Sequence, residues 1–277
     1  MRPRVHPAVL TGLALVHAGP AATWLPAVRR VLPGLAGVGD PGHVALTFDD
    51  GPDAHSTPLF LSALRRLGCH ATFFVLGEML ERHPQLGHRI VAEGHEMAVH
   101  GWGHGNALVS RPGRVTREIG RTVELVGAVT GVRPAWYRPP YGVLSAEALV
   151  AARLRGLRPV LWTAWGRDWT GSASPASVLA TMAPGLRGGA TLLLHDTDRT
   201  SAPGSWRSAL GALPELVDRC RSMGLRVGPL RDHDVGRAVT GSPRDPGMPE
   251  RAGRARRPRR HFEITFFPDP SFRDSER

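Results

Sequence analysis

The stretch that decides the fold of this chain is Val-Ala-Leu-Thr-Phe-Asp-Asp at residues 44–50, and Gly51 and Pro52 follow it directly. The apolar run predicts a buried strand, which must end at the two carboxylates because Asp and Gly are depleted in strands and Pro is confined to strand ends and edges. At a strand end the chain bends, so both carboxylates can reach one cleft. One can then bind a metal or stay ionised while the other handles protons. Taken alone, these residues also fit a solvated turn.

A pair of histidines follows a second short apolar segment. His100 and His104 are four residues apart and lie on one face if the chain turns helically between them. That spacing suits a divalent metal, although the chain has 13 histidines and such pairs also arise by chance. Together with one carboxylate from the first strand, the two imidazoles would supply three protein ligands. A three-ligand site leaves a position open for water or substrate, which is typical of a catalytic metal.

Apolar runs alternate along the chain with segments of helical apolar spacing. The expected strands are 44–48, 71–76, 96–99, 135–137, 157–165, 190–194 and 225–230, and the expected helices are 78–93, 114–130, 145–155, 205–223 and two that start at Thr57 and Ser174 as N-caps. This alternation predicts a parallel sheet covered by helices. The polar candidates come just after strands, and a (β/α) barrel carries its chemistry at that edge.

Two further clusters complete an ordered set of motifs. Tyr-Arg-Pro-Pro-Tyr-Gly at 137–142 follows a short strand, Asp168 precedes Trp169, and the apolar strand 190–194 ends at His195. With the two clusters above and Ala-Thr-Phe-Phe-Val-Leu-Gly at 71–77, the set resembles the polysaccharide deacetylase family, also called the NodB-homology group or carbohydrate esterase family 4. The resemblance covers residues 42–232 and implies an α/β fold, a distorted (β/α)7 barrel of the NodB-homology type.

The resemblance assigns a role to each matching residue. Asp49 matches the catalytic base and Arg138 its arginine partner, while His195 matches the general acid and Asp168 the carboxylate that orients it. The metal ligands would be Asp50, His100 and His104, usually with zinc, although cobalt or nickel can serve. The residues around the acetyl group would be Tyr141, through its backbone N–H at the oxyanion, and Trp169 and Leu193 as apolar walls.

Elementary chemistry agrees with these roles. A divalent cation polarises an amide carbonyl and lowers the pKa of water toward ~7. An arginine beside Asp49 favours its ionised form, and His195 titrates in a range that suits protonation of a leaving amine. The sequence departs from the family pattern at Gly101, where Ser or Thr is common, and at Trp165, where the family often has Asp. We expect a looser loop at the first position and an altered substrate groove at the second.

Three functions remain open on the sequence alone. The first is removal of acetyl groups from an N-acetylated glycan such as chitooligosaccharide or peptidoglycan, and the second is O-deacetylation of the acetyl-xylan type with the same residues. The third is a non-catalytic carbohydrate-binding relic. Retention of the base, the acid, its partner and all three metal ligands speaks against the relic.

Composition divides the 277 residues into three parts: an apolar and basic extension at 1–39, a catalytic domain at 40–235, and an Arg- and Pro-rich tail at 236–277 that we expect to be disordered. The net charge of +11 comes mostly from the two ends. No nucleic-acid-binding motif accompanies the arginines, so we expect no nucleic-acid partner. Cys69 and Cys220 are too few and too far apart to indicate a disulfide framework, and we expect a monomer.

The extension admits more than one interpretation. Residues 8–16 resemble a short secretory signal, whereas residues 24–35 could form an amphipathic helix that packs on the barrel or lies on a membrane. Membrane contact through residues 1–39 is therefore one expectation. An extracytoplasmic or membrane-associated location and a cytoplasmic one are both left open.

Overall fold

The computed structural model describes residues 7–236, and the tail at 237–277 lies outside them. Their strands form one sheet in the order β5-β4-β3-β2-β1-β7-β6, with β8 beside the start of β1. The strands are β1 (His43–Asp49), β2 (Thr72–Leu76), β3 (Glu96–Gly101), β4 (Trp136–Tyr137), β5 (Arg158–Pro159), β6 (Ala164–Trp165), β7 (Thr191–His195) and β8 (Arg226–Gly228). Every pairing is parallel. The seven strands from β5 to β6 in this order curl into a half-barrel, to which β8 adds at β1, and they confirm the predicted distorted (β/α)7 fold.

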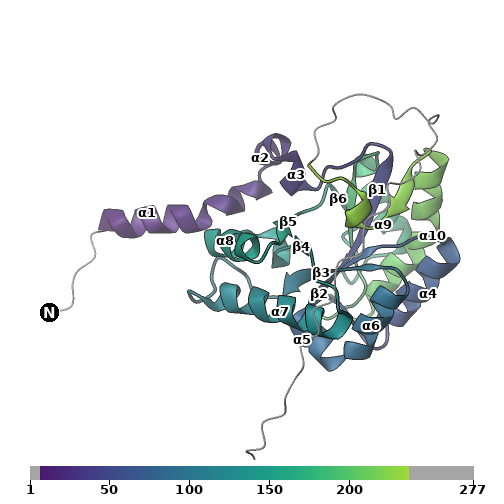
Figure 1. Cartoon of the computed structure of the whole chain (residues 1–277). Coiled ribbons are helices and arrows are strands. Elements are labelled where there is room, and N and C mark those ends of the chain that lie inside the picture. Colours follow the sequence, from purple (N-terminus) through teal and green to yellow (C-terminus); the bar gives the residue numbers. More distant parts are fainter. Residues whose placement is uncertain (1–6, 237–277) are drawn as a thin grey trace, which may run out of the picture. The chain divides into compact units, whose positions relative to one another are not determined.

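Helices connect the strands and surround the sheet (Figure 1). Those within the barrel are α4 (Thr57–Leu67), α5 (Gly77–Arg82), α6 (Pro84–Ala92), α7 (Arg114–Thr130), α8 (Ala146–Leu154), α9 (Pro175–Met182) and α10 (Trp206–Ser222). Ahead of β1 come α1 (Pro7–Ala18), the 3-10 helix η1 (Gly19–Trp24), α2 (Pro26–Val31) and α3 (Pro33–Ala36). Short 3-10 helices follow three of the later elements: η2 (Pro140–Gly142), η3 (Ala183–Gly185) and η4 (Leu230–Asp232).

Strand β1 lies in the middle of the sheet and is buried along its whole length. Such a strand has apolar cover on both faces, which explains its nearly continuous apolar sequence. The Phe48 ring packs against Phe60 of α4 and Phe73 of β2, with ring centroids 5.1 and 5.2 Å apart. The register sets Asp49 level with His195 of β7. The strand-end side chains of β1 and β7 are therefore neighbours across the sheet.

Two expected elements are interrupted. The helix expected at 78–93 is two helices, because Pro84 has no N–H to continue α5 and instead occupies the first turn of α6. The strand expected at 157–165 is also two, β5 and β6. Residues 160–163 cross the open side of the half-barrel, where Leu161 N–H donates to the Leu35 carbonyl oxygen (2.8 Å). The chain ahead of β1 thus supplies the pairing that a missing strand would have supplied.

The two predicted N-caps have different outcomes. Ser174 caps α9, and its hydroxyl accepts from Ser177 N–H, as predicted. The prediction for Thr57 was wrong, because Ser56 occupies the N-cap position and Thr57 is the first helical residue. The Thr57 hydroxyl accepts from Asp53 N–H and donates to Asp196. It therefore stabilises the loop between β1 and α4 and does not cap the helix.

The first helix exposes apolar side chains. Val9, Leu13, Leu15 and Val16 of α1 are all more than half exposed. Among the described residues, no helix combines the length and the apolar character needed to cross a bilayer. Contact of residues 1–39 with a membrane surface stays a prediction. Both cysteines are buried and free, as expected.

Candidate active site

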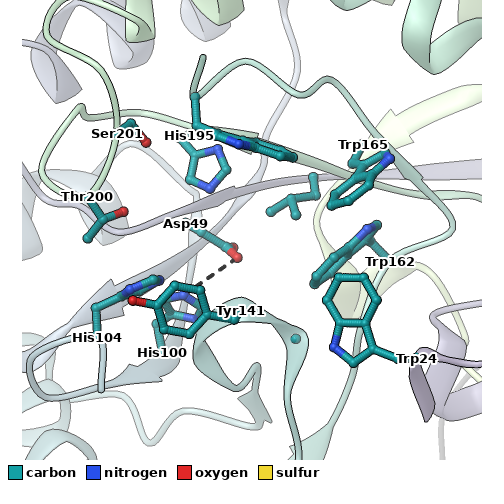
Figure 2. A pocket seen from close by; sticks show the side chains of 13 residues that line it. Trp24, Asp49, His100, His104, Tyr141, Trp162, Trp165, His195, Thr200 and Ser201 are labelled. Carbon is teal, nitrogen blue, oxygen red and sulfur yellow. Dashed lines mark ion pairs between the residues drawn. The ribbon is translucent and has the colours of Figure 1, made fainter. Parts of the chain in front are cut away.

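The polar residues that end the central strands line one cavity of ≈ 330 Å³ (Figure 2). Asp49 ends β1, His100 lies near the end of β3, and His195 ends β7. Because these strands run parallel, their carboxyl ends meet at one edge of the sheet, where a barrel fold concentrates its chemistry. Local sequence pattern and sheet topology together bring these residues into one place.

Asp50, His100 and His104 form a compact group with one ligand atom each, all within 4.8 Å of one another. His100 Nε2 lies 3.3 Å and His104 Nε2 3.4 Å from Asp50 Oδ1. Asp50 Oδ1 is buried and has no hydrogen-bond partner among the described residues. Buried polar atoms are normally paired, so this oxygen, aimed at two imidazoles, fits a bound cation.

The protonation of these groups also suits a cation. His100 Nδ1 donates to the Arg138 carbonyl oxygen (2.8 Å), which leaves Nε2 with its lone pair toward Asp50. Burial lowers the pKa of His104 to about 4, so its ring is neutral near pH 7. Burial alone would raise the pKa of Asp50, but its interactions with the imidazoles of His100, His195 and His104 hold it well below its usual range. A carboxylate and two imidazoles are a ligand set for a divalent metal.

Unusual backbone conformations direct these ligands. Asp50 and His104 have positive φ angles of 78° and 60°, and non-glycine residues in this region cost roughly 1–3 kcal/mol each. At Gly101 φ is 111°, a conformation that side chains rarely adopt. Glycine therefore suits this position of the chain. The departure from the Ser or Thr of the family accompanies a sharp change of direction after β3, and the predicted loosening of this loop is untested.

The second carboxylate of the opening motif has a cationic partner. Asp49 Oδ1 accepts from an Arg138 guanidinium nitrogen at 2.7 Å, and both side chains are buried. The same guanidinium donates to the Thr47 hydroxyl (2.8 Å) and the Leu161 carbonyl oxygen (2.9 Å). A fixed guanidinium favours the charged form of the carboxylate beside it. Asp49 is thus a buried carboxylate that lines the cavity beside a cation, where it can accept a proton.

His195 lies across the cavity with a carboxylate behind it. Asp168 accepts from His195 through both oxygens, from Nδ1 at 3.0 Å and from the backbone N–H at 2.7 Å. His195 Nε2 then faces the cluster, 4.0 Å from Asp50 Oδ2. Burial would lower the pKa of His195, but the charge and hydrogen bond of Asp168, with Asp50 and Asp49, raise it to about 10. At neutral pH His195 is therefore an imidazolium that can donate a proton from Nε2.

The remaining predicted residues form the walls. Trp169 and Leu193 line the cavity next to His195, and the Trp169 ring meets the imidazole edge-on at 5.7 Å between centroids. Tyr141 lies in η2 with a positive φ of 59°, and its ring packs against His104 at 4.4 Å. The part that its N–H plays at an oxyanion is a prediction that these contacts do not test.

Several lining residues were missed from the sequence. Trp24, Trp162, Thr200 and Ser201 all line the cavity, and the Thr200 hydroxyl donates to Asp50. Thr200 and Ser201 follow β7 in a loop at the carboxyl edge of the sheet, and that position could have marked them. Nothing in the sequence marked Trp24, which precedes the barrel. Trp165, the second departure from the family pattern, also lines the cavity, in agreement with an altered groove.

The fold and the site together define a class of protein. A half-barrel of parallel strands carries a buried carboxylate paired with arginine, a histidine paired with aspartate, and a three-ligand cation site between them. A base, an acid and an open metal site are the parts of a metal-dependent hydrolase.

Comparison with known proteins identifies the family. Residues 36–160 match the sequence profile of the Polysaccharide deacetylase family. The chain is 31% identical to a peptidoglycan-N-acetylglucosamine deacetylase of Bacillus cereus over 209 residues, which are 74% of this chain and 73% of the relative. It is 34% identical to a chitooligosaccharide deacetylase of Rhizobium leguminosarum bv. trifolii over 187 residues, 68% of this chain and 80% of the relative. This chain belongs to the polysaccharide deacetylase family.

The fold has a solved counterpart. The crystal structure of the Bc1960 peptidoglycan N-acetylglucosamine deacetylase in complex with 4-naphthalen-1-yl-N-oxidanyl-benzamide matches with a TM-score of 0.69 and 28% identity. The match covers 76% of this chain and 97% of that one. The resemblance inferred from the ordered motifs is thus confirmed at the level of family and fold.

Proposed function

We propose that this chain hydrolyses the N-acetyl groups of N-acetylglucosamine-containing glycans, with zinc at Asp50, His100 and His104. Relatives that act on peptidoglycan and on chitooligosaccharides support the substrate class. The observation that carries the proposal is the arrangement of two charge pairs about one cation site. Asp49 of the Asp49–Arg138 pair and His195 of the His195–Asp168 pair line the same cavity as the two ligand imidazoles, His100 and His104.

Each residue has one task in this reaction. When bound, the metal supplies a Lewis acid that polarises the carbonyl and acidifies water. Asp49 takes one proton from the attacking water, whose oxygen forms the new bond to the carbonyl carbon. Arg138 holds that carboxylate in place as an anion until the proton arrives. The Tyr141 N–H donates to the oxygen on which negative charge develops.

His195 completes the reaction. Its Nε2 proton passes to the amide nitrogen as the carbon–nitrogen bond breaks, so that the sugar leaves as a free amine and not as an amide anion. Asp168 keeps Nδ1 protonated and stabilises the imidazolium before transfer. The products are acetate and an amino sugar, and exchange with water then removes the proton from Asp49 and returns one to His195.

Acetate release from a panel of acetylated glycans tests the proposal. N-acetylglucosamine oligomers should lose acetate, a chelator should abolish the release, and added Zn²⁺ should restore it, with Co²⁺ and Ni²⁺ as comparisons. Asp49→Asn should still bind the metal but lose about 10²–10⁴-fold in kcat. If the zinc-loaded protein released acetate only from acetyl-xylan, the activity would be O-deacetylation. If it released none from any glycan, the proposal would be overturned.

A further inference from the structure

We propose that Trp24 and Trp165 form a subsite for an uncharged sugar residue next to the one that reacts, so that the enzyme selects neutral N-acetylglucosamine oligomers. The inference rests on the proposed function and narrows its substrate. It starts from a segment outside the region that the family profile matches, since that match begins at residue 36. Trp24 ends η1 and still lines the cavity that holds Asp49 and His195.

The segment around Trp24 is fixed to the wall of the active site. Arg29 of α2 donates through Nε to the Thr23 carbonyl oxygen (2.7 Å) and through a terminal nitrogen to the Trp162 carbonyl oxygen (3.2 Å). The same guanidinium lies 5.7 Å from the Trp24 ring centroid and 5.4 Å from that of Trp162. Thr23 itself is buried. Trp24 is therefore held in position before any ligand arrives, which reduces the entropy lost on binding.

Trp24, Trp162 and Trp165 form an aromatic wall on one side of the cavity (Figure 2). Trp24 meets Trp162 and Trp165 edge-on, at 6.4 and 6.2 Å between centroids, and Trp162 stacks on Trp165 at 5.8 Å. Trp165 continues to Trp169, which borders His195. Trp162 is buried, so the open aromatic surface away from His195 belongs to Trp24, which is 42% exposed, and to Trp165, which like Trp169 is half-buried.

The position of Trp165 connects this wall to the family comparison. Trp165 stands where the family often has a carboxylate, and it is the residue that Trp24 contacts. An aspartate there would offer no ring edge for Trp24 and would place a charge against an apolar surface. Trp165, the departure inside the barrel, and Trp24, the residue ahead of the barrel, are thus parts of the same aromatic wall. On the opposite side of the cavity Tyr141, 53% exposed, offers a second aromatic surface (Figure 2).

The chemistry of this surface fits a neutral pyranose. Aromatic faces carry partial negative charge, and the C–H groups on the face of a sugar ring carry partial positive charge. Thr200 and Ser201 line the cavity on the side away from these tryptophans and add neutral hydroxyl groups to it (Figure 2). Apart from the catalytic groups, no Arg, Asp or Glu is among the described residues that line the cavity. The Arg29 guanidinium beside Trp24 and Trp162 already donates to the Thr23 and Trp162 carbonyl oxygens. A carboxylate held against the open ring faces would therefore lose water without a cationic partner from the lining outside the catalytic groups, which is unfavourable. A neighbouring N-acetylmuramic acid, whose lactyl ether bears a carboxylate, is therefore disfavoured.

Steady-state kinetics of the full chain test the subsite. Trp24→Ala should raise KM for N-acetylglucosamine tetramer about tenfold, the loss expected for one aromatic contact and its buried area, with kcat much less affected. The loss on the monosaccharide should be clearly smaller. Trp24→Phe should have a KM close to the wild-type value. The wild-type protein should prefer the neutral tetramer to muramic-acid-containing fragments of the same length. Leu25→Ala, at a neighbouring residue that is 58% exposed and does not line the cavity, is the matched control.

Binding separates failure of the subsite from failure of the proposed function. Calorimetric titration of the tetramer into Asp49→Asn, with and without Trp24→Ala, needs no catalysis. Tetramer binding that weakens on loss of Trp24 supports the subsite even if no acetate is released. Equal losses on tetramer and monosaccharide, unchanged tetramer binding, or equal preference for muramic-acid fragments would overturn it. Thermal melting of each variant shows whether a loss of tetramer binding is caused by unfolding. If Trp24→Ala unfolds, the tetramer affinity of Trp24→Phe is compared with that of the wild type instead.

Discussion

Replacing Arg138 with methionine should lower the melting temperature of this domain far more than loss of a surface arginine does. Arg138 is completely buried, and its guanidinium serves Asp49, Thr47 and the Leu161 carbonyl oxygen at 2.7–2.9 Å. Methionine preserves much of the apolar stem and fills the space. The substitution removes the positive charge and its donors, and it leaves the Asp49 carboxylate buried without its hydrogen-bonded guanidinium partner.

The size of the effect follows from that unpaired charge. Breaking a buried ion pair by removing one partner costs about 3–5 kcal/mol, because the remaining charge keeps its desolvation penalty. In a domain of this size 1 kcal/mol corresponds to roughly 2–4 °C in Tm, so the expected decrease is about 6–20 °C. The double variant Arg138→Met/Asp49→Asn removes both charges and should recover a large part of that decrease.

Thermal and chemical denaturation of the single and double variants provide the measurement. Arg226→Met is the matched control, because Arg226 pairs with Asp40 at 2.8 Å on the surface, with 64% and 32% of the two side chains exposed. Exposed pairs contribute about 0–1 kcal/mol. Equal Tm changes for Arg138→Met and Arg226→Met, or a double variant no more stable than Arg138→Met, would refute the idea that a stranded Asp49 charge causes the loss.

Three other predictions follow from the structure. Asp168→Asn should move the falling alkaline limb of kcat/KM to lower pH, because the reaction needs protonated His195 and Asp168 is the partner that contributes most to raising its pKa to about 10. An unchanged pH profile would remove Asp168 from the mechanism. His104→Ala should weaken Zn²⁺ binding in calorimetry by at least tenfold while the apo protein melts near the wild-type temperature, and undiminished affinity would exclude His104 as a ligand. The buried His43 and His233 rings share a 2.8 Å hydrogen bond, and burial and His43 lower the pKa of His233 to about 4. Since the pKa of His233 in the unfolded chain is ~6.5, its neutral form contributes about 3 kcal/mol to the free energy of unfolding above pH ~6.5, and this contribution is lost as pH falls through about 4. Urea denaturation between pH 7 and 4 should show this loss. A His43→Phe/His233→Phe variant should show less of it.

The sequence by itself determined the barrel and the identity of its central polar residues. Two apolar runs, one ending at Asp49 and one at His195, each predict a strand and the residue at which it ends. Parallel pairing then brings those strand ends to one edge of the sheet. These signals are local in the chain, and the step from them to the site needs only the rule that parallel strands share an edge. The ordered spacing of the motifs was sufficient to identify the family.

Local signals failed where long-range contacts decide the outcome. The apolar pattern at 157–165 is the same whether the segment is one strand or two. The sheet order, which places β5 and β6 at opposite edges, and the pairing of Leu161 with Leu35 show that it crosses the open side of the barrel. At Pro84 the missing N–H was visible in the sequence, yet the apolar spacing continued across it, and spacing alone does not register a lost hydrogen bond.

The aromatic wall depended on tertiary structure alone. Arg29 and Trp162 are 133 residues apart, and their hydrogen bond holds Trp24 over a cavity built by later strands. Neither periodicity nor a motif encodes such a contact, because it arises from packing of side chains that meet only when the barrel has formed. The sequence therefore determined which groups carry out the reaction, and the tertiary structure decided which surface the rest of the substrate meets.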